Sequence, residues 1–402
     1  MAGSPANALA VIGAGVSGCA LLAQLRRLGW TGELSVWETG RSPGGRASTR
    51  RSRRGPGLRF DHGAPLFNIS SQPAPELLAP LLEGGWIEPW PGTIAQLDRD
   101  GQLQPHPGDR FSDGQLFRGR GGMDQLCQGL LHLAGARVER QFGTLVRHLV
   151  VTATGRWHWL DGAQQRLGEA DWLVLSGTLL AHPRSRRLLG WDEPPLQPVA
   201  RRLGDPQLDR TLAAIAALHH EPRCTLLLPI QADHGQSWRD LPFRWLSFDP
   251  GAQQRWDLER LSIQPFDDGR CAVVAHATAA FASKHLDVFG SGSTVAGRRT
   301  SDPTDAQEEA MIRVLSAALQ EVMERWISPS ERGGSPCQLM RWGAALAQPP
   351  GLFAELMLCP QSRIGFCGDG FAGPGFGRLE GALRSSEALA RQLMATVEPI
   401  SA

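Results

Sequence analysis

The spacing of apolar residues predicts a strand, a helix and a second strand within the first 38 residues. Residues 9–12 are a short apolar run typical of a buried strand, and a glycine-rich turn follows at 13–18. Apolar residues then recur at helical spacing over residues 19–28, and Gly29 ends that pattern. Residues 33–37 alternate as a second strand that ends at Glu38. This order predicts a βαβ unit at the start of the chain.

A similar pattern returns near the C-terminus, and the pattern between is less regular. We expect a strand at 364–367, a glycine loop and a helix at 379–394. The centre predicts helices at 124–133 and 305–325, and strands at 137–150, 156–160, 172–175, 224–228 and 271–275. Residues 71–115 are rich in Pro and Gly and show few clear periods.

The turn at residues 13–18 has the spacing G-x-G-x-x-G of a dinucleotide-binding loop. In such a loop Gly13 permits the tight turn, Gly15 lets the backbone approach a pyrophosphate, and Gly18 lets helix and strand pack closely. Ser17 lies within the loop, and Glu38 follows Gly18 by 20 residues, near the distance at which an acid binds ribose hydroxyls. The alternative is a glycine turn that binds nothing.

A second glycine loop follows the second strand directly, over residues 44–50. Gly44 and Gly45 allow a close approach of the backbone, and the fork of Arg46 suits phosphate oxygens. An enzyme that binds only NAD has no need of a second phosphate loop here, so FAD is favoured.

Composition narrows the chemistry. The chain has 402 residues, a net charge of +1, no tyrosine, and Lys284 as its one lysine. Tyrosine therefore cannot serve as acid or cage wall, and a lysine mechanism would depend on Lys284 alone. Near-neutral charge gives no general reason to expect a polyanionic partner. The length allows two or three domains.

One basic run raises the question of nucleic acid. It comprises Arg41, Arg46, Arg50, Arg51, Arg53, Arg54 and Arg59. Without interleaved aromatic residues, we favour a solvated loop with Arg46 on phosphate over nucleic-acid contact.

Seven scattered cysteines, with no C-x-x-C pair, fit neither a disulfide framework nor a zinc site, and no other metal site is expected. The absence of a signal-peptide pattern and of a long apolar run predicts a cytoplasmic protein without a membrane span. No H-E-x-x-H motif occurs, and the one G-x-S-x-G spacing, at residues 40–44, is not a nucleophile elbow because no helix pattern follows it directly, so hydrolase chemistry of those kinds is not expected.

Taken together, these motifs resemble the two-dinucleotide-binding-domain flavoproteins of the flavin amine oxidase superfamily. Residues 60–67 resemble the F-D-H-G-A-x-x-F segment of its renalase-like branch, and residues 366–370 with 377–382 resemble its C-G-D…G-R-V-E-G-A signature. Individually weaker matches follow in the family's order at 142–146, 221–224, 276–278 and 341–342. The resemblance spans nearly the whole chain.

The resemblance implies an α/β fold with a Rossmann-type FAD-binding domain of the glutathione-reductase and amine-oxidase type. This domain would be discontinuous, over residues 1–70, 120–185 and 350–402. A mixed α+β substrate-binding domain would be inserted over residues 71–119 and 186–349.

The resemblance also implies roles for individual residues around a non-covalent FAD. The backbone of Val146 would meet adenine, and Gly63 and Ala64 would lie in the segment beside the flavin. Asp369, after a strand and Gly368, could take ribitol hydroxyls or hydroxyls near the pyrophosphate. Leu379 opens a helix whose N–H could stabilise negative charge at the N1/O2 edge of the flavin.

The implied reaction is hydride transfer from a small-molecule donor to FAD, with dioxygen or another electron acceptor. Within the renalase-like branch, the donors are isomeric reduced nicotinamide nucleotides. His62, His276 and Trp342 would lie on the catalytic side, although a structural role is equally open for each histidine. The sequence departs from the pattern of this branch at His220, at residues 343–344 and at residues 373–376, all on the expected substrate side.

Two alternatives therefore stay open: a flavin desaturase or isomerase of the same fold acting on an apolar substrate, and a flavin-binding protein without turnover. The absence of tyrosine, with Lys284 outside every matched motif, disfavours an ordinary monoamine oxidase.

Overall fold

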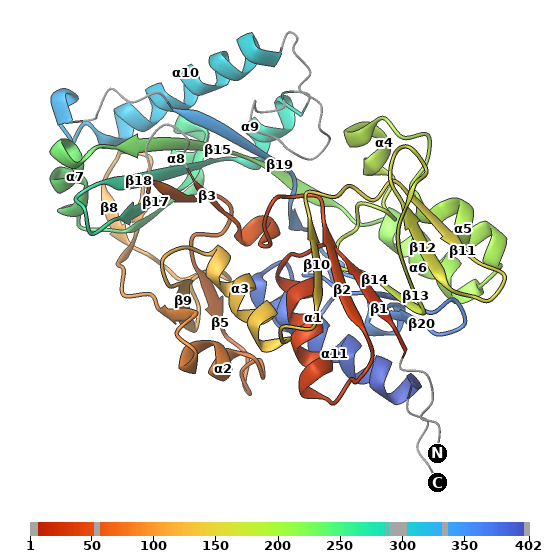
Figure 1. Cartoon of the computed structure of the whole chain (residues 1–402). Helices are drawn as coiled ribbons and strands as arrows, with labels where there is room; N and C mark the ends of the chain where they lie inside the picture. Colours follow the sequence, from red (N-terminus) through yellow and green to blue (C-terminus); the bar gives the residue numbers. More distant parts are fainter. Residues whose placement is uncertain (1–6, 52–56, 287, 289–303, 332–336, 398–402) are drawn as a thin grey trace.

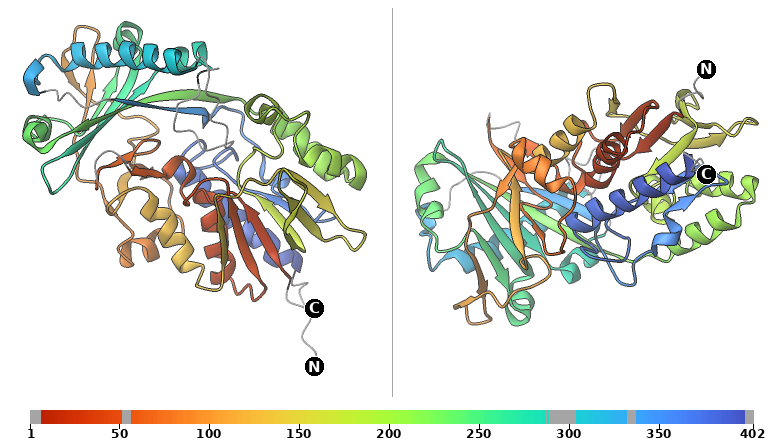
Figure 2. Two further views of the ribbon diagram at one scale, coloured as in Figure 1. Left: turned by 45° about the horizontal axis from the view of Figure 1, so that its top comes forward. Right: turned by 90° about the horizontal axis from the view of Figure 1, so that it is seen from below.

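Two large β-sheets organise the chain, each with helices packed against it (Figure 1). The computed structural model describes residues 7–51, 57–286, 288, 304–331 and 337–397. The first sheet contains the N-terminal βαβ unit, and the second lies beside it, as both views in Figure 2 show.

The first sheet has six strands in the order β10 (Glu139–Phe142), β2 (Leu34–Glu38), β1 (Leu9–Ile12), β14 (Trp172–Leu175), β21 (Ile364–Phe366) and β20 (Leu358–Cys359). Its neighbours run parallel except β20, which is antiparallel to β21. Residues of β1 and β14 are buried almost throughout, because parallel strands covered on both faces read as apolar runs.

Beside this sheet, α1 (Val16–Arg27) packs against both α3 (Asp124–Leu133) and α11 (Leu379–Val397). A small antiparallel sheet, of β11 (His148–Val151), β12 (Trp157–Leu160) and β13 (Arg166–Ala170), also packs against it. Trp37 of β2 meets Trp159 of β12 edge-on, with ring centroids 5.3 Å apart. The first and last helices of the chain are therefore neighbours, as expected for a domain built from both ends of the chain.

The second sheet has seven strands in the order β19 (Gln338–Ala347), β15 (His220–Ile230), β18 (Cys271–Ala277), β17 (Leu258–Pro265), β16 (Trp245–Phe248), β7 (Ile94–Leu97) and β8 (Leu103–Pro105). One face packs its apolar residues with α7 (Ala232–Arg239), α8 (Pro250–Trp256), α9 (Ala279–Lys284) and α10 (Thr304–Met323). On the other face Leu227 and Val274 pack with Leu58 and Phe60 of the N-terminal segment.

Smaller elements connect the two sheets. They are the pair β3 (Thr49–Arg51) and β4 (Arg59–Asp61), the three-stranded sheet β5 (Phe67–Ile69), β9 (Gln115–Gly119) and β6 (Ile87–Pro89), and the helices α2 (Leu78–Glu83), α4 (Arg184–Leu189), α5 (Leu196–Leu203) and α6 (Pro206–Ala216).

Both large sheets draw their strands from segments far apart in the chain. All strands of the six-stranded sheet come from residues 9–38, 139–175 and 358–366, and all strands of the seven-stranded sheet come from 94–105 and 220–347. Leu196, Leu208 and Ile215 pack in the core of the first sheet although they lie within the segment 186–349. The exact division into domains stays a prediction.

Within the described residues, no helix combines the length and the apolar character needed to cross a bilayer. The same residues contain no cluster of His, Cys, Asp and Glu that could hold a metal ion.

Candidate active site

The first glycine loop joins β1 to α1, and two of its glycines are required by the fold itself. Gly13 has φ +108°, and a Cβ there would lie 2.6 Å from Ser176 Oγ. A Cβ on Gly18 would lie 2.1 Å from the carbonyl oxygen of Gly13. Any side chain at these positions would therefore disturb the contact between α1 and the strands beside it.

Gly15 is different, because nothing in the protein requires it to lack a side chain. It caps the N-terminus of α1 with φ −73° and ψ −178°, a conformation open to other residues, and no atom lies within 4 Å of a Cβ built there. The open space lies at the start of a 12-residue helix, where backbone N–H groups and the helix dipole favour a phosphate. Ser17 is buried, and its hydroxyl donates to the Ser176 carbonyl at 3.2 Å.

The second glycine loop lies directly against the first. The Gly44 N–H donates to the Ala14 carbonyl at 2.8 Å, and Gly15 and Gly44 form an isolated parallel bridge. Gly45 has φ +55°, and a Cβ on it would lie 3.3 Å from the Cα of Gly15. The two loops that the sequence assigns to phosphates thus meet at one place, and together we call them the double glycine loop.

Glu38 lies at the end of β2 beside this double loop. Its carboxylate accepts the Ala14 N–H at 2.9 Å and the Gly40 N–H at 2.7 Å, so the fold holds it next to the glycine turn. The Thr144 N–H donates to the Glu38 carbonyl at 2.9 Å, which brings the segment of the buried Val146 alongside. Glu38, expected to bind ribose, therefore lies next to the segment of Val146, which is expected to contact adenine.

Arg46 and Asp369, which are 323 residues apart, form a two-pronged ion pair. The Arg46 guanidinium lies 2.7 Å and 2.5 Å from the two carboxylate oxygens, and it also donates to the Ala345 carbonyl at 2.7 Å. Burial would raise the pKa of Asp369, but Arg46 outweighs it and lowers that pKa. In this structure Arg46 is thus engaged by protein, and its role on phosphate stays a prediction.

The turn before α11 is held by a residue that the sequence reasoning did not single out. Glu380, in the first turn of α11, has no exposed surface. Its carboxylate accepts hydrogen bonds from the backbone N–H and the hydroxyl of both Ser70 and Ser71, and Arg378 lies 3.0 Å away. These contacts position the N-terminus of the helix at Leu379. In the sequence, the signal for this role is an acidic residue in the first turn of a helix that is expected to be buried.

The three expected catalytic side chains lie near one another, beside the second glycine loop. The His62 and Trp342 rings lie 5.2 Å apart, and a Cβ on Gly63 would lie 3.3 Å from the Trp342 ring. His276 lies on β18, close enough to His62 for a charge on His62 to lower the pKa of His276. The Ala64 N–H donates to the Arg46 carbonyl at 3.0 Å, which ties this group to the second glycine loop.

Both histidines are uncharged at neutral pH. Burial, with a smaller effect of Arg50, lowers the pKa of His62 to about 4. Burial first, then Arg260 and Arg223, lowers the pKa of His276 well below its ordinary value. A neutral imidazole donates one hydrogen bond through its N–H and accepts one at its other ring nitrogen, but it lacks the second proton with which an imidazolium acts as an acid.

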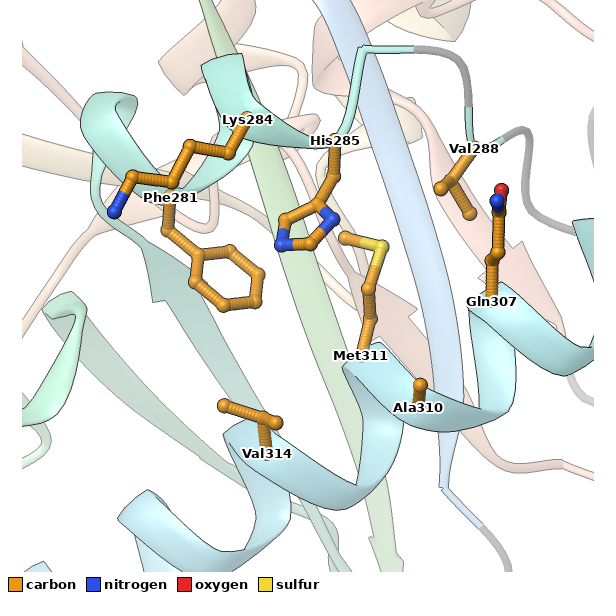
Figure 3. A pocket seen from close by; sticks show the side chains of 8 residues that line it. All are labelled: Phe281, Lys284, His285, Val288, Gln307, Ala310, Met311 and Val314. Atoms are coloured by element: carbon orange, nitrogen blue, oxygen red, sulfur yellow. The ribbon is translucent and has the colours of Figure 1, made fainter.

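Lys284 lies away from these residues. It lines a cavity of about 340 Å³ between α9 and α10, on the helix-covered face of the seven-stranded sheet (Figure 3). Elsewhere in the basic run, Arg51 pairs with Asp124 at 3.0 Å, whereas Arg53 and Arg54 lie outside the described residues.

All seven cysteines are free. Burial raises the pKa of Cys367 to about 12, so this residue is a thiol and a poor nucleophile.

Comparisons with known proteins agree with this architecture. Residues 11–81 match the model of the NAD(P)-binding Rossmann-like domain. No curated protein matches the chain by sequence. Among solved structures, cyclohexylamine oxidase from Brevibacterium oxydans IH-35A is 14% identical with a TM-score of 0.61, covering 97% of this chain and 100% of that one.

Two further structures are similar over nearly their whole length. Putrescine oxidase is 14% identical with a TM-score of 0.59, and a provisionally assigned protoporphyrinogen oxidase from Exiguobacterium sp. 255-15 is 13% identical with a TM-score of 0.61. Each comparison covers 97% of this chain and 99% of the other. The chain therefore has the α/β fold of these oxidases, with a Rossmann-type nucleotide-binding domain and a mixed second sheet.

Proposed function

We propose that the chain is an FAD-dependent oxidoreductase of the oxidase type. It would hold FAD without a covalent bond, accept a hydride from a small-molecule donor, and pass electrons to dioxygen or another acceptor. The observation that carries this proposal is that the double glycine loop with Glu38 lies next to the His62–Trp342 pair. The Rossmann-like match and the likeness to oxidases support it.

The residues around the double loop fit FAD. The open backbone at Gly15, with Gly45 beside it, suits a pyrophosphate at the start of α1. Glu38 would bind ribose hydroxyls, Val146 would contact adenine, and Asp369 would contact ribitol. We assign Gly13, Ser17, Gly18, Arg46, Gly63, Ala64, Gly368 and Leu379 to the surrounding wall. FAD would supply the hydride-accepting chemistry when bound.

On the catalytic side, the protein would orient the donor rather than exchange protons with it. The His62 and Trp342 rings offer aromatic surface for a planar donor, and His276 offers a neutral ring nitrogen. A donor that becomes cationic on losing hydride needs no protein base. The thiol of Cys367 and the distant Lys284 support a non-covalent cofactor and a lysine-independent reaction.

We propose that the donors are isomeric reduced nicotinamide nucleotides, as in the renalase-like branch. The polar face around Arg223, Arg260 and His276 favours such donors over the apolar substrate of a desaturase or isomerase. The seven free cysteines also favour a reducing, cytoplasmic setting.

The test is anaerobic stopped-flow mixing of the FAD-loaded protein with isomeric reduced nicotinamide nucleotides. Rapid loss of the visible flavin absorbance is expected, and it should return when air is admitted. Bleaching by an apolar donor alone would support the desaturase or isomerase reading. No bleaching with any hydride donor would leave only a flavin-binding protein.

A further inference from the structure

One face of the seven-stranded sheet carries charged and aromatic side chains where the opposite face is apolar. In the strand register, Trp342 pairs with Arg223, and His276 pairs with both Thr225 and Arg260. Directly paired residues point to the same side of a sheet, and alternate residues of one strand do so too. These five side chains therefore share the face on which Trp342 meets His62.

The two arginines on this face are buried and held by glutamates. Arg223, 7% exposed, contacts Glu221 and Glu259 at 2.8 Å each. Arg260, 13% exposed, contacts Glu259 at 2.5 Å and lies 5.6 Å from the centre of the Trp245 ring. A guanidinium fixed in this way presents its remaining N–H groups in a set direction.

A third arginine reaches the same place from the loop that follows β8. Arg110 and Arg260 each lie 4.8 Å from the centre of the Phe111 ring. Arg110 is exposed, so the group extends to the molecular surface. The three arginines and the two glutamates, Glu221 and Glu259, together carry a net charge of +1.

The unpaired polar atoms of this face point to the same kind of ligand. In the part of the chain that the structure describes, Arg223 Nε, Trp342 Nε1, Thr225 Oγ1 and His276 Nε2 are buried without a hydrogen-bond partner. The arginine and indole nitrogens can only donate, whereas the hydroxyl and the neutral imidazole can do either. All four atoms can therefore act as hydrogen-bond donors, and a ligand group rich in acceptors would complement them.

We propose that the donor oxidised at this site carries an anionic, acceptor-rich group, a carboxylate or a phosphate, recognised by Arg110, Arg223 and Arg260 while its ring lies against Trp342. This inference rests on the proposed function and identifies the group of the donor, and the residues of the protein, through which the donor is recognised. Arginine suits both anions, because its planar fork matches two oxygens at once.

Two pairs of probes separate charge from shape and distinguish the two anions. Benzoate is compared with benzamide for the carboxylate, and phenyl phosphate with phenol for the phosphate. Their dissociation constants are measured by titration calorimetry on the FAD-loaded protein. We expect at least one anion to bind about tenfold tighter than its neutral partner, a difference of about 1.4 kcal/mol. The pair with the larger preference identifies the anion.

The variants Arg260→Gln and Arg110→Gln should reduce this preference to about threefold or less, and Arg260→Lys should retain part of it. Arg110 lies on an exposed loop, so its variant is informative even where Arg260→Gln folds poorly. Arg255→Gln is the control: Arg255 also pairs with a glutamate and lies 4.5 Å from an indole, that of Trp256, but on α8. It should keep the wild-type preference.

Equal affinities for charged and neutral probes, no binding of any probe, or a preference that both glutamine variants retain would overturn the inference. Flavin reduction is measured separately. If donors reduce the flavin but the probes show no preference for anions, this inference fails and the proposed function stands. If the probes show that preference but no donor reduces the flavin, the proposed function fails and the anion site stands.

Discussion

Gly15 offers a substitution that should remove cofactor binding and leave the fold intact. An alanine Cβ meets no protein atom within 4 Å, and the φ of −73° suits alanine. The same Cβ would project into the open space at the start of α1 that we assign to the pyrophosphate. Gly13→Ala and Gly18→Ala cannot separate these effects, because their side chains collide with the protein.

The expected loss can be estimated from the contacts at risk. Hydrogen bonds from backbone N–H groups to a charged phosphate contribute about 1.5–3 kcal/mol each. Moving the phosphate away from the helix start would lose one or two of them. An overall loss of about 3 kcal/mol corresponds to roughly a hundredfold weaker FAD binding. Stability should change by less than about 1 kcal/mol, because the reduced freedom of the unfolded chain offsets alanine's poorer capping.

The assay is fluorescence titration of apoprotein with FAD, together with thermal unfolding of the apoprotein. Gly162→Ala is the matched control, since Gly162 also lacks neighbours within 4 Å and lies in the turn between β12 and β13, away from the double loop. It should bind FAD as wild type does. Unchanged FAD affinity in Gly15→Ala would refute the assignment of this space to the pyrophosphate, and a collapse of thermal stability would refute the claim that the fold tolerates alanine.

Three further predictions concern stability and catalysis. Burial raises the pKa of Asp61 from 3.8 to about 6, so the folded protein holds this proton more tightly than the unfolded chain does. Acid therefore favours wild type, and Asp61→Asn should gain about 2.4 kcal/mol relative to wild type between pH 4 and pH 8 in urea unfolding; a pH-independent difference would contradict this. Glu380→Gln should lose about 3 kcal/mol, because it weakens several hydrogen bonds to a buried carboxylate, and unchanged unfolding would show that these bonds contribute nothing. Lys284→Met should leave the rate of flavin reduction nearly unchanged; a hundredfold loss, about 2.7 kcal/mol, would place Lys284 in the reaction.

The spacing of apolar residues along the chain correctly predicted the helices and strands that are long or buried. The helix expected at 305–325 is α10, Thr304–Met323, and the βαβ unit and the C-terminal helix form as expected. The strands expected over 137–150 and 156–160 form as β10, β11 and β12, with a hairpin between β11 and β12, but β10 and β11 belong to two different sheets and Gly143, with φ +71°, lies between them. The strands between residues 67 and 119 have three to five residues, too few to show a clear period.

The candidate site could be predicted where a motif requires a particular backbone, but not where distant residues meet. The glycine loops have local spacing that reports their own geometry. The pairing of Arg46 with Asp369 and the contacts of Glu380 with Ser70 and Ser71 join residues more than 300 positions apart. Such contacts depend on how the two ends of the chain come together, and no local pattern encodes them.

The central claim is that this chain holds FAD without a covalent bond, and the most direct test is the visible absorbance spectrum of the purified protein before and after acid precipitation. We predict flavin absorbance in the native protein, or after FAD is added, and release of all the flavin into the supernatant on precipitation. No flavin absorbance even with added FAD would contradict the cofactor assignment, and flavin that stays with the precipitate would contradict the non-covalent site.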